Sequence, residues 1–194
     1  MSETPSYPDP LHLVSYPAPV LRQRCTEVTV FDDQLRLFCE RMIDAMEAWK
    51  GVGLAAPQVG VAQRIFVTNH TGVGPDSLPD RRIWINPTLE LSGPEQAHEE
   101  GCLSIPGVYA QVKRPPRVTV RYQDVHGEPA AIELDGEAGE FLAVVVQHEY
   151  DHLNGVLFLD HVAPMHLAML RRRLKELEKA YKKETGTAGA VLRR

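Results

Sequence analysis

The stretch Gln147-His148-Glu149-Tyr150-Asp151-His152 places two histidines four residues apart, with a glutamate directly after the first. On an α-helix, positions i and i+4 lie one turn apart on the same face, so both imidazoles can reach one metal ion. Glu149 then lies beside any water that such a metal holds. The pattern is typical of a metal-dependent hydrolase.

The residues before this stretch are strongly apolar, which favours a buried helix over an exposed one. They are Phe141, Leu142, Val144, Val145 and Val146. We expect the helix over about residues 140–154, ended by Asn154-Gly155. Two helical histidines alone can also be surface residues, or core residues bonded to carbonyl groups. In an apolar helix, however, buried polar side chains need partners, and a divalent cation provides one.

The remaining elements are read from hydrophobic spacing and from turn residues. Helices are predicted over residues 31–50, with Asp32 and Asp33 at the cap, and from Pro164 to about Glu184. Strands are predicted at 64–68, 82–86, 117–122 and 130–134, with an exposed loop at 72–80. Strands in the middle and helices at the ends predict an α+β fold. In it, antiparallel or mixed sheets pack around the central metal-binding helix, with one helix near each end of the chain.

Length and composition favour a single domain over residues 1–184. A chain of 194 residues with 43% hydrophobic content can bury one core and shows no obvious division. Residues 185–194 are polar and contain glycine, so we expect a flexible tail. The net charge is −5, yet nine Lys and Arg against three Glu follow from Pro164 onward. This basic helix is either an ordinary solvated face or a site that docks on ribosomal RNA.

The cysteines and the amino terminus bear on the cellular compartment. Three cysteines, Cys25, Cys39 and Cys102, argue against a disulfide framework and fit a reducing environment. No apolar run approaches the roughly 20 residues of a membrane span. Residues 1–10 hold three prolines and no Lys or Arg, unlike a secretory signal. We therefore expect a cytoplasmic protein.

Three segments carry the chemistry-bearing residues: GVGLAAPQ at 51–58, EGCLS at 100–104 and QHEYDH at 147–152. The glycines and small residues of the first favour a loop that lines a site. In this order, the three segments resemble the three motifs of the peptide deformylases. The resemblance covers nearly the whole chain, and the joint occurrence of three motifs is highly specific.

The resemblance implies one divalent metal ion held by Cys102, His148 and His152. Three protein ligands leave a coordination position open for water, which is the pattern of catalytic sites. Iron(II) is the expected ion in the cell, while zinc, nickel and cobalt also suit these ligands.

The resemblance also implies the catalytic groups. Glu149 takes a proton from water and returns it to the leaving amine, as general base and then general acid. The side-chain amide of Gln58 and the backbone N–H of Leu103 donate hydrogen bonds to the oxygen that becomes negative during attack.

The implied substrate is the amino-terminal formylmethionine of newly synthesised polypeptides, from which formate is released. Val52 and Gly53 are expected to border the substrate, with backbone meeting backbone at the glycine. Glu100 is assigned to the substrate-binding group, although it can also pair with a buried arginine or hold the loop around Cys102. His98 departs from the aliphatic residue of several relatives near the methionine pocket, and Tyr109 is expected to roof the cleft.

Two other classes of function are compatible with parts of the sequence. A zinc metallopeptidase uses the same helical pattern, but its third histidine is replaced here by Phe158, and the downstream Glu176 lies in the basic helix. A non-catalytic, metal-stabilised binding module predicts a closed coordination sphere or the loss of Glu149. Cys102 as a third ligand favours the deformylase interpretation over both.

Overall fold

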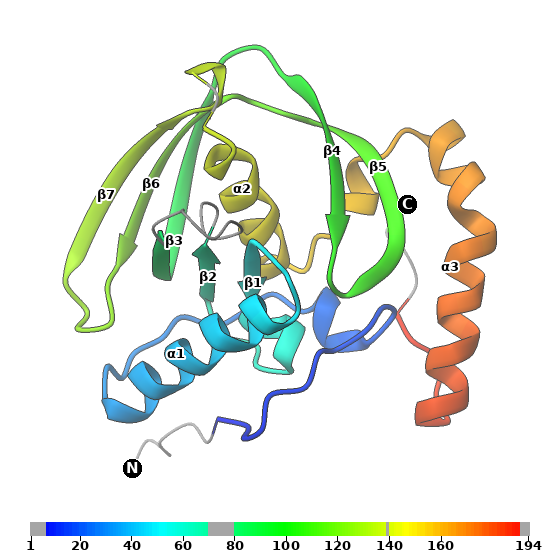
Figure 1. Ribbon diagram of the computed structural model, residues 1–194, viewed down its shortest axis with the longest axis horizontal. Coiled ribbons are helices and arrows are strands. Elements are labelled where there is room, and N and C mark those ends of the chain that lie inside the picture. The colour runs from blue at the N-terminus through cyan, green and yellow to red at the C-terminus, as the bar shows by residue number, and fades with distance from the viewer. Residues whose placement is uncertain (1–6, 70–79, 139, 191–194) are drawn as a thin grey trace.

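The structure is a computed structural model that describes residues 7–69, 80–138 and 140–190 (Figure 1). Its helices are α1 (Asp33–Ala48), α2 (Leu142–Leu153) and α3 (Pro164–Thr185). Its strands are β1 (Gly53–Ala55), β2 (Ile65–Asn69), β3 (Arg81–Ser92), β4 (Gln96–Cys102), β5 (Ile105–Arg114), β6 (Arg117–Gln123) and β7 (Pro129–Asp135). The predicted α+β class is confirmed.

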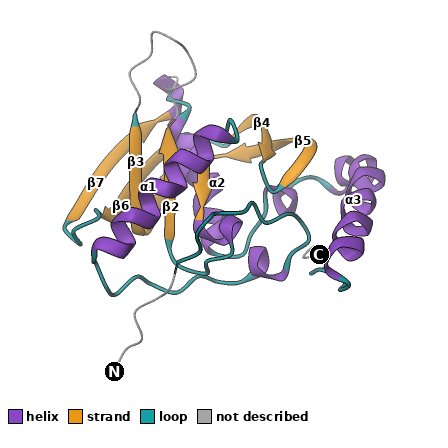
Figure 2. Cartoon of the chain, turned by 60° about the horizontal axis from the view of Figure 1, so that its bottom comes forward, coloured by secondary structure: helices purple, strands orange, loops and turns teal. Residues whose placement is uncertain are grey.

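The strands form two separate antiparallel sheets. Five of them pair in the order β1-β2-β3-β6-β7, while β4 and β5 form a hairpin of their own. Side chains alternate between the two faces of the larger sheet. Ile65 and Val67 of β2 pack in one hydrophobic cluster with α1, whereas Phe66 packs in another with α2. The two helices therefore cover opposite faces of this sheet (Figure 2).

Helix α2 lies between the five-stranded sheet and the hairpin (Figure 1). Its residues from Leu142 to Glu149 are all buried, because apolar side chains surround this part of the helix. The helix ends at Leu153 and is capped by Asn154, and Gly155 follows with a φ of 67°. A side chain at Gly155 would strike the backbone of Arg22, so glycine is required there on two grounds.

Helix α3 packs on the outside of the hairpin. Leu174 is buried, and its neighbours on the same stripe, Leu167, Leu170, Leu177 and Tyr181, are half-buried against it. The stripe is thus a core contact, as predicted. After α3 the backbone N–H of Ala190 donates to the carbonyl of Pro17 at 2.7 Å. Residues 191–194 of the expected tail lie outside the described residues.

The predicted helices agree with the structure to within about two residues, and Asp32 caps α1 by accepting from Leu35 N. The four predicted strands correspond to β2, β3, β6 and β7, but β3 continues to Ser92. The prediction missed β1 and the whole β4–β5 hairpin, which surrounds Cys102. Of the predicted loop, residues 72–79 lie outside the described residues. In the described ranges, no helix is both long and apolar enough to cross a membrane.

Candidate active site

Three potential metal ligands converge from two elements. Cys102 ends β4, while His148 and His152 lie one turn apart on α2. The Cys102 sulfur lies 3.3 Å from Nε2 of His152, and the ligand atoms of all three residues fall within 4.8 Å of one another. Tetrahedral bonds of about 2.0–2.3 Å place ligand atoms roughly 3.5 Å apart. The three ligand atoms are therefore spaced to bind one tetrahedral metal ion, and the structure brings the three predicted ligands together.

The electrostatics of the two histidines also suit a cation. Burial and the neighbouring His148 lower the pKa of His152 to about 3, which keeps its imidazole neutral. Burial opposes a charge on His148, yet hydrogen bonds to Cys102 and Glu100 and the charge of Glu149 raise its pKa well above the ordinary value. Positive charge is thus favoured on His148 and disfavoured on His152. Nδ1 of His152 has no hydrogen-bond partner among the described residues.

Glu149 lies beside this cluster and is buried. Burial raises the pKa of its carboxyl to about 7, so it can exchange a proton near neutral pH. Its Oε2 atom has no hydrogen-bond partner among the described residues. Its other side rests against Gly53, where any Cβ would collide with the carboxylate. A buried carboxylate with a free oxygen and a tuned pKa can serve as a proton carrier.

Gln58 is held by its carbonyl oxygen so that its amide nitrogen points into the site. It lies in a short 3-10 helix, Ala56–Val59, where the N–H of Ala55 donates to its Oε1 at 2.7 Å. Its Nε2 lies 3.4 Å from the Cys102 sulfur and 3.4 Å from the Ser104 hydroxyl. The loop predicted here is therefore a strand and a helical turn. Its geometry fixes a hydrogen-bond donor beside the ligand cluster.

Glu100 does not offer a free carboxylate to a substrate. Its Oε1 accepts from Nε of Arg114 at 2.8 Å, and its Oε2 accepts from the same guanidinium at 2.9 Å and from Nδ1 of His148 at 2.8 Å. Burial opposes ionisation, but these hydrogen bonds lower the pKa of Glu100 to about 2. Both oxygens are thus occupied by Arg114 and His148, while Glu100 also lines the cleft. The bond to Nδ1 of His148 leaves Nε2 as the other nitrogen with which this ring could bind a metal.

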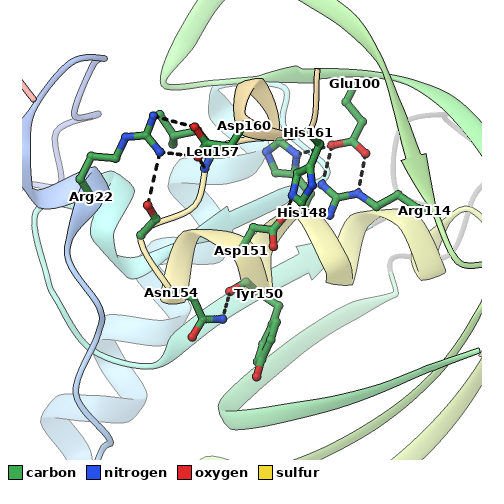
Figure 3. Close-up of polar contacts among 11 residues, drawn as sticks. Arg22, Glu100, Arg114, His148, Tyr150, Asp151, Asn154, Leu157, Asp160 and His161 are labelled. Carbon is green, nitrogen blue, oxygen red and sulfur yellow. Dashed lines mark hydrogen bonds and ion pairs between the residues drawn. The ribbon is translucent and has the colours of Figure 1, made fainter. Parts of the chain in front are cut away.

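Arg114 continues this network to the surface (Figure 3). Its NH1 donates to Oδ2 of Asp151 at 2.6 Å, and the same oxygen lies 2.8 Å from Nε2 of His161. Arg114 is 4% exposed. A buried arginine was one of the partners considered for Glu100, but the sequence did not indicate which arginine it is. The alternation of Val108, Ala110, Val112 and Arg114 on one face of β5 is the signal that could have found it.

A cleft of about 420 Å³ opens above these groups. All the predicted site residues except His152 line it. They are Val52, Gly53, Gln58, Glu100, Cys102, Leu103, His148 and Glu149. Tyr109 lines it too and is 64% exposed at the rim, with its ring against Gly101. His98 lies on β4 opposite Val112 and does not line the cleft.

The family model for polypeptide deformylase matches residues 10–168. A peptide deformylase of Thermotoga neapolitana is 47% identical over 163 residues, which are 84% of this chain and 93% of the relative. One from Brucella suis is 45% identical over 166 residues, or 85% of this chain and 91% of the relative. The crystal structure of a plant peptide deformylase superimposes with a TM-score of 0.90 at 36% identity, covering 97% of this chain and 100% of the other.

The chain belongs to the polypeptide deformylase family. It is therefore a hydrolase that removes the formyl group from the amino-terminal methionine of polypeptides. This membership decides against the metallopeptidase and against the non-catalytic binding module. The family is metal-dependent, and in this deformylase Cys102, His148 and His152 form a group that could hold the metal.

Proposed function

We propose that Cys102, His148 and His152 hold the single metal ion of this deformylase and that Glu149 moves the protons of the reaction. The observation that carries the proposal is the convergence of three ligand atoms within 4.8 Å beside a buried carboxylate with one unpartnered oxygen. A divalent ion, when bound, supplies Lewis-acid chemistry that polarises a carbonyl and acidifies water.

The remaining steps belong to the side chains and backbone of the cleft. Glu149 accepts a proton at Oε2 as water attacks the formyl carbon, and it then gives this proton to the methionine nitrogen as the C–N bond breaks. The products are formate and a free amino terminus. Nε2 of Gln58 and the N–H of Leu103 donate to the formyl oxygen while it carries negative charge. The bond from Ala55 keeps the amide of Gln58 in the donating orientation.

The substrate backbone is proposed to lie along Val52 and Gly53. The chain just before β1 lines the cleft, and glycine allows a peptide to approach the backbone closely. The methionine side chain then packs against Val144 and Val145 of α2, which line the cleft. Glu100 contributes indirectly, because its bond to His148 sets the ring orientation.

Iron(II) is the proposed ion in the cell, with zinc, nickel or cobalt as alternatives, because thiolate and imidazole ligands accept all four. Anaerobic purification followed by metal analysis, and by formate release with each metal, tests this choice. The ligand assignment predicts that His152→Ala retains the fold but loses stoichiometric metal. Full metal content in a folded His152→Ala protein would contradict it.

We also propose a cytoplasmic location and contact with the ribosome through α3. Its exposed face carries Arg171, Arg172, Lys175, Lys179 and Lys183. Such a face suits an anionic RNA surface, and its binding weakens steeply with salt. Cosedimentation with ribosomes at low and high salt tests the contact. Wild-type protein should pellet at low salt only, and a variant with Lys175, Lys179 and Lys183 changed to Glu should stay in the supernatant. Equal pelleting of the two proteins contradicts the proposal.

A further inference from the structure

Lys50 has a backbone conformation that lysine rarely adopts. Its φ is 60°, and apart from glycines only Asn86 shares a positive φ among the described residues. Asparagine tolerates this region, and the Asn86 side chain is bonded to the backbone of Val28. Lys50 follows the end of α1, with its N–H donating to Glu47 O. This is the position where helices commonly use glycine.

The side chain of Lys50 is not used to hold the fold. No hydrogen bond or ion pair of its ammonium group is found within residues 7–69, 80–138 and 140–190. The residue is exposed and lines the active-site cleft, immediately before Gly51 and Val52. A strained lysine with a free charge at a cleft is better explained by a ligand than by packing.

The other exposed charge of the cleft is Glu99 on the hairpin. The remaining carboxylates that line it, Glu100 and Glu149, are buried. Lys50 is thus the one lysine or arginine among the residues that line the described cleft. Gly53 lies against Glu149, and Lys50 lies three residues earlier along the same lining of the cleft. Three residues of an extended peptide span about 10 Å. A substrate whose methionine lies at Glu149 therefore carries its next two side chains along the cleft that Lys50 lines.

We propose that Lys50 is a specificity-determining residue that favours acidic side chains at the two positions after the formylmethionine. The proposal rests on the proposed placement of the substrate along Val52 and Gly53. Because the charge is exposed, the interaction is screened by salt and changes the rate by a small factor. The contact with Lys50 should act mainly on KM. The acidic side chains lie away from the reacting bond, so they interact with Lys50 equally in the bound substrate and in the transition state.

The test compares two amidated peptides of equal shape, formyl-Met-Asp-Asp-Ala and formyl-Met-Asn-Asn-Ala, at low ionic strength. The readout is the ratio of kcat/KM for the acidic peptide to that for the neutral one. Lys50→Gln and Lys50→Gly should lower this ratio about two- to fivefold, while Lys50→Arg keeps it. Glu99→Gln should raise it. Lys113→Gln, an exposed lysine of β5 outside the cleft, is the control and should leave the ratio at the wild-type value.

Thermal unfolding separates this role from a structural one. Lys50→Gly relieves the left-handed backbone, so its midpoint should equal or exceed that of the wild type while the ratio falls. The inference is overturned if Lys50→Gln leaves the ratio unchanged, or if Lys113→Gln lowers it equally. In either case, deformylation of the neutral peptide leaves the proposed function standing. Failure of the wild type on both peptides overturns the proposed function and the inference with it.

Discussion

A Cβ atom built on Gly53 would lie 2.8 Å from Cδ of Glu149, so the backbone of β1 meets this carboxylate with no side chain between them. Gly53 has no left-handed backbone to explain its presence. The close approach is therefore the reason for glycine at this position, and it fixes where Glu149 can lie.

Gly53→Ala should displace Glu149 and lower kcat about 100-fold, because small displacements of a catalytic group cost this much. Gly51→Ala is the matched comparison. Its Cβ would meet Cδ1 of Leu103 at 2.7 Å, but this is the mobile end of a side chain. Steady-state kinetics on both variants, with circular dichroism as a folding check, measures the difference. Equal losses in the two variants would show that the contact with Glu149 is unimportant.

Glu100→Gln should weaken metal binding about 10- to 100-fold, since partners of this kind orient the ligand and raise its basicity. The substitution keeps the shape of a side chain that holds both His148 and Arg114. Competition with a chelator gives the affinity. Glu99→Gln removes a neighbouring exposed carboxylate as a control and should bind the metal as the wild type does. If Glu100→Gln also retains wild-type metal affinity, its proposed role in orienting His148 is wrong.

Gln58→Leu should lower kcat about 10²–10³-fold by removing a donor to the developing oxyanion. The same change leaves the buried N–H of Ala55 without its acceptor, at a cost of roughly 1–3 kcal/mol in stability. Denaturant unfolding measures this second effect separately. A variant that loses stability but keeps its kcat would show that Gln58 only shapes the loop.

Native metal-free protein should react with iodoacetamide at Cys102 before its other thiols. Burial raises the pKa of Cys25 to about 11 and that of Cys39 to about 12, so neither supplies reactive thiolate at neutral pH. Mass spectrometry of the alkylated protein should find one modified thiol, with Cys102→Ser unmodified. Added metal should protect Cys102 if its sulfur is a ligand. Rapid labelling of Cys39 in folded protein would contradict the burial.

The sequence predicted the elements with a strong local signal. The apolar run before His148 located α2, and the leucine stripe located α3 and its buried face. The β4–β5 hairpin was missed because polar residues fill most of β4, while Pro106 and Gly107 interrupt the start of β5.

The site residues were predicted from three sequence motifs. The structure adds the distances between them, their hydrogen-bond partners and their backbone conformations. The approach of Cys102 to His152 spans fifty residues of sequence, so no local pattern could predict its distance. The arginine that pairs with Glu100 was not identified, because Arg114 lies at the end of a missed strand. Lys50 was overlooked because neither lysine nor the residues beside it indicate a positive φ in the sequence. Such features depend on tertiary packing.

The role of Glu149 is tested by formate release from formyl-Met-Ala-Ser by the metal-loaded wild type and Glu149→Gln, prepared anaerobically with metal content measured in the same samples. The wild type should release formate rapidly. A Glu149→Gln protein that binds the same amount of metal should release it about 10²–10⁴-fold more slowly, because it lacks the group that carries the proton. Wild-type activity in that fully metallated variant would show that Glu149 does not carry the proton.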